Sequence, residues 1–319
     1  MRGRGTIVTV RVASLLPSAT EILFALGLGS QVVATSHECD HPAEARLRPR
    51  VVRTVVDPSR PSQEVDRQVR ELASAGRPVF LVDLQQIRTL RPTVVVTQAV
   101  CEVCAVGPCQ VVPLADALPG VRVVRLQATS LEGVWEDVLR VAEACGVPER
   151  GRALASQLRD AVRAVTAAVA GRPRLRVACV EWLDPPYVAG HWVPEMVWRA
   201  GGQDVMGEPG RPSWRTTWSQ VDGADPEVVV LMPCGFSLEA AWDRRAELAA
   251  QPAFLGLRAL RHGSVYVADA NAHFSRPGPR LVEGLQTLAA LLHPGCGFQP
   301  LARRLTLQDL PAAATVGEG

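Results

Sequence analysis

The feature that most constrains this chain is an amphipathic stretch near its middle, PERGRALASQLRDAVRAVTAAVAG. Between Leu154 and Val169, apolar side chains recur at the i, i+4, i+7 and i+8 spacing of a helix with one buried face. Pro148 suits a first helical turn, and Gly171 followed by Pro173 indicates a stop. We therefore predict a helix over Pro148–Ala170, ~33 Å long at about 1.5 Å per residue.

Two interpretations of this helix are open. It is either a crossover inside one doubly wound domain or a strut between two lobes. The 319 residues are enough for either arrangement. Strand-like and helix-like segments alternate on both sides of the helix, which favours two Rossmann-like α/β lobes with mainly parallel sheets. The predicted parts are an N-terminal lobe over 8–147, the connecting helix over 148–171, a C-terminal lobe over 172–294 and a loosely ordered tail over 295–319.

The expected elements follow from apolar periodicity. Predicted strands are Val8–Ala13, Gln31–Thr35, Thr93–Thr97, Val121–Leu126, Arg174–Val180, Glu227–Met232 and Ser264–Ala268. Predicted helices are one that Ser18 caps together with Glu21, and Ser62–Ser74, Leu84–Leu90, Leu131–Ala144, Pro194–Ala200 and Leu281–Leu292. Within Ser62–Ser74, Val65 and Leu72 share one side, so Asp66 is expected to point away from the core.

Composition excludes several classes of function. A net charge of +2 offers no strong field for nucleic acid or a membrane surface. The apolar runs are strand-length, so no membrane insertion is expected. The N-terminus lacks the apolar region of a secretory signal, and the eight cysteines have the irregular spacing of reduced thiols; we therefore expect a cytoplasmic protein. No serine-triad, Walker or dinucleotide motif stands out.

The chemically unusual residues fall where predicted strands end. In open α/β sheets, ligands bind beyond the carboxyl ends of the strands. The N-terminal candidates are Pro17, Ser18, Thr20, His37, Glu38, Cys39, Asp40, Gln98, Cys101 and Glu102. The C-terminal candidates are Glu181, Trp182, Asp184, Tyr187, His191, Trp192, Trp214, Trp218, Cys234, Phe236, Asn271, His273 and Phe274. For Ser18, simple helix capping is the alternative to ligand binding.

Large aromatic side chains are distributed unevenly. Before the central helix there are only Phe24, Phe80 and Trp135, whereas five tryptophans and one tyrosine lie between Trp182 and Trp218. Each ring can supply ~150–250 Å² of contact, and at ~25 cal/mol/Å² two rings supply several kcal/mol of gross binding. The C-terminal loops therefore suit a large, flat, partly apolar ligand. We assign Trp135, Trp198 and Trp242 to packing instead.

Metal-ligating residue types gather in SHECDHP and CEVC. A set of His37, Cys39, Cys101 and Cys104 would suit zinc or iron. The alternative is hydrogen-bonded loop histidines and buried small thiols, because a single C-x-x-C is weak evidence.

Several blocks together resemble the vitamin B12-binding members of the periplasmic-binding-protein superfamily, over residues 10–293. They are VASLLPSATEILFALGLGSQVVATSHECDHP, LRPTVVVTQ, EWLDPPYVAGHWVPEMVWRAGG, WSQVDGADPEVVVLMPCG and NAHFSRPGPRLVEGL. The resemblance implies two lobes joined by one long helix, with a corrinoid (cobalamin or a cobinamide-like ligand) clamped between them. One specific hypothesis for the His/Cys cluster is that a His or Cys such as His37 ligates the cobalt of the corrinoid. We expect a binding protein that breaks no bond. Related members bind ferric siderophores or haem.

The resemblance also implies a partner. Transport members dock on an ABC permease through an acidic residue on each lobe, and the matching positions near Pro49 and Trp192–Val193 are not acidic. A cytoplasmic corrinoid handler is therefore an alternative to a transport protein. A further alternative is a cytosolic metal- or cluster-binding enzyme or metallochaperone that acts on a tetrapyrrole-like substrate.

Overall fold

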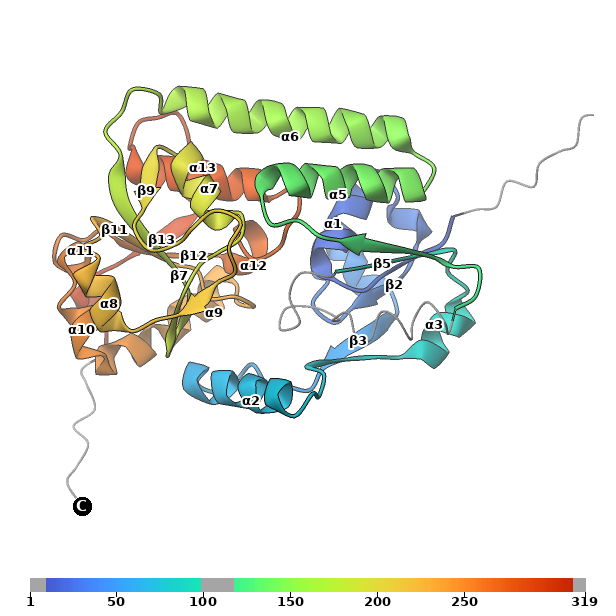
Figure 1. The fold of residues 1–319 in the computed structure, drawn as a ribbon, viewed down its shortest axis with the longest axis horizontal. Coiled ribbons are helices and arrows are strands. Elements are labelled where there is room, and N and C mark those ends of the chain that lie inside the picture. The colour runs from blue at the N-terminus through green and yellow to red at the C-terminus, as the bar shows by residue number, and fades with distance from the viewer. Residues whose placement is uncertain (1–9, 99–117, 312–319) are drawn as a thin grey trace, which may run out of the picture. The chain divides into compact units, whose positions relative to one another are not determined.

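The computed structural model describes residues 10–98 and 118–311. They divide into two compact units. The first unit contains residues 10–56, 71–98, 118–127 and 135–156, and the second contains 57–70, 128–134 and 157–311. Each unit has its own sheet and its own helices, which can be followed by their labels in Figure 1. The predicted fold class, two α/β lobes with mainly parallel sheets, is confirmed.

The sheet of the first unit has the strand order β4-β3-β2-β1-β5-β6. Its strands are β1 (Val12–Ser14), β2 (Val32–Ser36), β3 (Arg50–Thr54), β4 (Phe80–Val82), β5 (Val94–Gln98) and β6 (Arg122–Leu126). Every neighbouring pair is parallel except β3 and β4. The sequence VVVTQ of β5 is buried at every position, as expected for a parallel strand covered on both faces.

Helices α1 (Pro17–Ala25) and α3 (Leu84–Leu90) contact this sheet, and parts of three further helices belong to the first unit. These three are α2 (Ser62–Ser74), α5 (Leu131–Ala144) and α6 (Pro148–Ala168). The core contains Ile22 and Leu23 of α1 with Val138 and Val141 of α5, all fully buried. Short 3₁₀ turns cover Gly29–Gln31 and Ala43–Leu47. Among the described residues, no helix is both long enough and apolar enough to cross a membrane.

The long helix α6 begins at the predicted residue and ends two residues early, at Ala168. Its buried positions include Leu158, Val162 and Val165, which lie on the predicted apolar face. Gly151 permits a close approach to α5, because a Cβ there would overlap the side chain of Ala142.

The second unit has a mixed sheet of order β10-β8-β7-β11-β12-β13, with β9 also paired to β7. The strands are β7 (Leu175–Leu183), β8 (Pro186–Val188), β9 (Gly202–Asp204), β10 (Trp214–Arg215), β11 (Val228–Leu231), β12 (Val265–Ala268) and β13 (Ala302–Leu305). The central strands β9, β7, β11 and β12 are parallel, and β8, β10 and β13 are antiparallel additions.

Strand β13 corrects the prediction of a loosely ordered tail from residue 295. It pairs antiparallel with β12 and so satisfies the outer backbone groups of that strand. Leu305 is fully buried in the core cluster of this unit, which supplies the reason that the segment is held.

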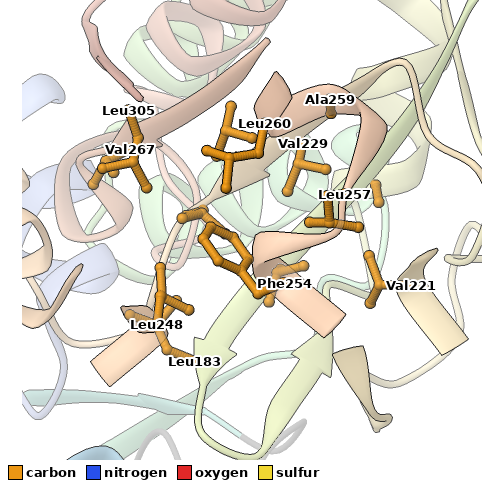
Figure 2. Close-up of a cluster of buried hydrophobic side chains, with 14 of the residues drawn as sticks. Leu183, Val221, Val229, Leu248, Phe254, Leu257, Ala259, Leu260, Val267 and Leu305 are labelled. Carbon is orange, nitrogen blue, oxygen red and sulfur yellow. The ribbon is translucent and has the colours of Figure 1, made fainter. Parts of the chain in front are cut away.

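Short helices surround the second sheet. They are α7 (Val193–Arg199), α8 (Trp218–Gly223), α9 (Leu238–Asp243), α10 (Pro252–Leu255), α11 (Arg258–Arg261), α12 (Ala270–His273) and α13 (Leu281–Leu292), with 3₁₀ turns at Arg244–Ala250 and Leu307–Asp309. Figure 2 shows the ring of Phe254 within the core cluster, among side chains that include Leu248, Leu260 and Val267. Trp218 packs edge-on against Phe254 at 4.8 Å between ring centroids.

Candidate functional site

In each unit several of the predicted site residues lie at the carboxyl ends of the parallel strands. Thr20 follows β1, His37 follows β2, and Cys234 follows β11. Strand β7 runs to Leu183, further than predicted, so Glu181 and Trp182 form its end and do not follow it. Since the carboxyl ends of parallel strands share one edge of a sheet, each unit gathers its candidates along one edge.

The strand ends of the first unit carry small, buried polar groups. Thr20 Oγ1 lies 2.7 Å from Ser14 Oγ and 3.0 Å from Cys39 Sγ. The backbone N–H of Ser36 donates to the same sulfur at 3.3 Å. Cys39 is only 1% exposed, so its thiol is a packed, hydrogen-bonded group.

Ser18 does not form the predicted capping box with Glu21. Helix α1 begins at Pro17 with Leu16 as its N-cap, and no side chain caps it. Ser18 is therefore already inside the first turn, and its buried hydroxyl oxygen has no hydrogen-bond partner among residues 10–98 and 118–311. The same holds, within these ranges, for two other buried hydroxyls at this edge, those of Thr35 and Thr97.

The predicted metal set is divided by what the structure describes. His37, Glu38 and Asp40 are half-buried, and the His37 ring lies 5.9 Å from that of Phe80. Among the described residues, no group of three or more His, Cys, Asp or Glu side chains could hold a metal ion. Cys101, Glu102 and Cys104 lie outside the described residues, so the set of His37, Cys39, Cys101 and Cys104 stays a prediction. Gln98, at the end of β5, is buried.

In the second unit, two aromatic side chains of the β7–β8 hairpin bind the beginning of α2. The indole N–H of Trp182 donates to the carbonyl of Ser62 at 3.1 Å. The hydroxyl of Tyr187 donates to Asp66 Oδ1 at 2.8 Å. Asp66 is 8% exposed and also accepts from Arg70 at 2.9 Å. The prediction that Asp66 points into solvent is therefore wrong, because Tyr187 supplies a buried partner.

Arg244 binds the same segment from another side. Its guanidinium donates to the carbonyl oxygens of Pro58 and Arg60, to Ser62 Oγ at 3.3 Å and to Glu247 Oε1 at 2.7 Å. Glu247 Oε1 in turn accepts the backbone N–H of Ser62. Sequence reasoning missed this network, because an arginine within the charged stretch WDRRAE has no periodicity that would distinguish it from a solvated residue.

The electrostatics of this region favour protonated groups. Burial, together with the hydrogen bond to Asp66, raises the pKa of Tyr187 to about 12. Its hydroxyl therefore remains a donor at neutral pH. Burial, followed by the nearby carboxylates of Glu247 and Asp66, raises the pKa of Asp184, while Arg215 opposes the shift.

The remaining tryptophans correct three predictions. Trp218 is 3% exposed and donates to the carbonyl of Leu183, so it belongs to the core and not to a ligand face. Trp192 is also buried and donates to the carbonyl of Phe274 at 2.7 Å. Trp198, predicted to be packed, is 56% exposed, and the guanidinium of Arg174 lies over its ring at 3.4 Å.

Trp214, Trp135 and Trp242 have the exposure that the sequence predicts. Trp214, on edge strand β10, is 41% exposed. Trp135 and Trp242 are buried, as expected. The buried rings of Phe236 and Phe274 support the site from within the unit rather than from its surface.

The other loop candidates take part in hydrogen bonds through their backbone groups. His191 has a positive φ of 55°, and its N–H donates to the carbonyl of Arg211 at 2.6 Å. Burial lowers the pKa of His191 and of His273. Asn271 is half-buried, and its N–H donates to the carbonyl of Phe236; the N–H of Cys234 donates to the carbonyl of Glu181.

A family profile described as "Periplasmic binding protein" matches residues 12–272, which is most of the chain. The chain belongs to this family. The match includes the strand ends of both units described above.

Similar proteins extend over nearly the same length. A protein of Vibrio vulnificus named vitamin B12-binding protein is 23% identical over 86% of this chain and 87% of its own. Two solved structures share the fold. A periplasmic heme binding protein from Pseudomonas aeruginosa has a TM-score of 0.68 at 23% identity, over 92% of this chain and 97% of its own. The periplasmic vitamin B12 binding protein BtuF of Vibrio cholerae has a TM-score of 0.65 at 21% identity, over 88% and 96%.

Proposed function

We propose that this chain is a substrate-binding protein for a corrinoid, a ligand of the cobalamin or cobinamide class. The observation that carries the proposal is the similarity to a vitamin B12-binding protein over 86% of this chain, which spans both units. Its role is to bind and release the ligand without breaking bonds. An ABC permease is the partner that such a role requires, and a cytoplasmic corrinoid handler is the alternative.

The surface of the second unit suits such a ligand chemically. A corrinoid has a broad macrocycle edged with carboxamide groups. Trp182 and Tyr187 carry hydrogen-bond donors that suit amide oxygens, and these donors are given to Ser62 and Asp66 in this structure. On the other face of the β8–β10 ladder, where it pairs with Val188, the exposed ring of Trp214 offers an apolar surface.

Haem is the second candidate, supported by the similarity to a periplasmic heme binding protein. Haem presents two carboxylates in place of carboxamides. Arg215, exposed beside Trp214 on β10, is a suitable cation for such a group. A corrinoid would therefore depend on the ring of Trp214, whereas haem would depend on the charge of Arg215, the next residue of the same strand.

Calorimetric titration with cyanocobalamin, cobinamide and hemin tests the proposal. We expect the corrinoids to bind and hemin to bind more weakly. Replacing Trp214 by Ala is expected to weaken corrinoid binding by about tenfold, since a lost ring contact is worth about 1–2 kcal/mol. Trp198→Ala is the matched control, because this exposed ring is not at a strand end, and it should bind as the wild type does. Failure of both corrinoids to bind would refute the proposal.

A further inference from the structure

The start of α2 is held in the second unit by polar contacts rather than by an apolar face. In residues 57–70, only Ser62, Val65 and Asp66 are buried. Val65 is thus the only apolar side chain that this segment buries. Segments with few buried apolar contacts open at low free energy, so these residues are suited to move.

The contacts that hold this segment use the donors proposed for the ligand. An indole and a phenol each carry one donor hydrogen. Trp182 gives its hydrogen to the carbonyl of Ser62, and Tyr187 gives its hydrogen to Asp66. Neither donor can bind a ligand acceptor while these two hydrogen bonds persist.

Arg244 is the main anchor of the segment. Its side chain is 11% exposed, and the guanidinium lies over the ring of Phe236 at 4.2 Å. It donates to the backbone carbonyls of residues 58 and 60, while Glu247 accepts the N–H of Ser62 at the first turn of α2. Charged hydrogen bonds to free backbone groups at a helix start are effective anchors.

The geometry points to a latch: residues 57–70 cover the donors of Trp182 and Tyr187, Arg244 and Asp66 hold them there, and ligand binding at this surface releases them. Carboxamide oxygens of a corrinoid replace Ser62 O and Asp66 Oδ1 as acceptors. At Trp182 and Tyr187 the exchange leaves no donor unpaired, whereas the groups of Arg244 and Glu247 that bound the segment turn to water. Existence of the latch is independent of the proposed function, whereas its release by a corrinoid rests on it.

Weakening the latch has a predictable effect on affinity. A ligand that binds only the open state has an apparent dissociation constant equal to the intrinsic constant divided by the open fraction. Loss of Arg244 raises the open fraction and therefore tightens binding. If residues 57–70 instead form a fixed wall of the site, one that stays in contact with the bound ligand, loss of Arg244 weakens binding, because it removes contacts.

Amide hydrogen exchange of residues 57–70, followed by mass spectrometry, tests the latch in the whole protein. Arg244→Ala is expected to speed exchange in this segment by about tenfold or more. Arg245→Ala is the matched control, since Arg245 donates to the carbonyls of Trp242 and Asp309. It should exchange like the wild type in 57–70. Asp66→Asn, which replaces the charged acceptor of the Tyr187 hydrogen bond by a neutral one, is the second variant and should speed exchange to a smaller degree.

The ligand arm uses cyanocobalamin. We expect it to speed exchange of 57–70 in the wild type and to bind Arg244→Ala about three- to tenfold more tightly. Slower exchange on binding, or weaker binding by Arg244→Ala with unchanged melting temperature, would overturn release and identify a fixed wall. If no corrinoid binds, the proposed function fails, and the latch is judged by the variants alone. Unchanged exchange in Arg244→Ala and Asp66→Asn then overturns it.

Discussion

At the ends of its strands the first unit presents serine, threonine and cysteine, whereas the second presents tryptophan and tyrosine. The hydroxyls of Ser18 and Thr35 in the first unit are buried without partners in the part of the chain that the structure describes. In the second unit, the donors of Trp182 and Tyr187 are both hydrogen-bonded. Replacing such a hydroxyl in the first unit therefore removes an unmet hydrogen bond. Replacing Trp182 or Tyr187 in the second unit breaks a hydrogen bond that exists.

Buried carboxylates show the converse difference. In the first unit, Asp137 is 1% exposed and accepts from Arg140 and from the N–H of Gln127. In the second unit, Asp204 accepts two backbone N–H groups on Oδ1, but its buried Oδ2 has no partner among the described residues. Whether a buried polar group has hydrogen-bond partners thus depends on its own surroundings and not on the unit that contains it. Substitutions of individual residues can test this.

The largest expected effect on stability comes from adding a side chain at a tightly packed glycine, which tests how rigidly each unit holds its loops. A Cβ on Gly190 would lie 2.5 Å from the carbonyl oxygen of Arg211 and 2.6 Å from the carbonyl carbon of Pro212. These are backbone atoms, so the loop before His191 must shift. We expect Gly190→Ala to lower the free energy of unfolding by about 3 kcal/mol.

Gly29→Ala is the comparison in the first unit. Its Cβ would meet only the ring of Phe24, at 2.6 Å, and this half-buried side chain can turn away. The expected loss is about 1 kcal/mol or less. Urea titrations followed by circular dichroism measure both values. Equal losses would show that the loop of the second unit is no more rigidly held.

Asp204 should make stability depend on pH. Burial raises its pKa from 3.8 to about 6. A raised pKa means that the folded state favours the protonated acid, so this contribution is complete below pH 3.8 and is lost as the pH rises through 6. Asp204→Asn should therefore be more stable than the wild type at pH 8, by about 1–3 kcal/mol, and equally stable near pH 4.

Asp137→Asn is the opposite case. It loses the ion pair with Arg140 and is expected to destabilise the protein by about 2 kcal/mol at pH 8. Urea titrations of the wild type and both variants at pH 4 and pH 8 measure these differences in the free energy of unfolding. A stabilised Asp137→Asn, or an Asp204→Asn variant whose advantage persists at pH 4, contradicts the assignment.

Elements with strong periodicity were predictable from sequence. The bounds of α2, α3, α5 and α13 agree with the predictions, since each has an apolar stripe and clear end signals. The strands β3, β8 and β10 were missed, as were β4, β9 and β13. They are short and lie mostly at sheet edges, where the partner strand and not the residue pattern determines the structure.

The site was predictable in position but not in partners. The uneven distribution of aromatic side chains located Trp214, and the strand-end rule located Tyr187, because this rule depends only on strand direction. It could not separate the buried Trp218 from the exposed Trp198, since burial depends on what packs against each ring. Nor could it identify Asp66 as the partner of Tyr187, because the contact joins residues 121 positions apart.

The smallest effects separate satisfied from unsatisfied hydroxyls within the first unit. Thr35 lies in β2, and no described residue is a partner for its side-chain oxygen. Thr35→Val therefore removes an unmet hydrogen bond and should stabilise the protein by about 1 kcal/mol. Thr20→Val loses the bond to Ser14 and should destabilise it by about as much. The two substitutions are chemically identical, so size and shape cancel in the comparison. Unfolding free energies that shift in the same direction would show that partner satisfaction does not govern stability at this edge of the sheet.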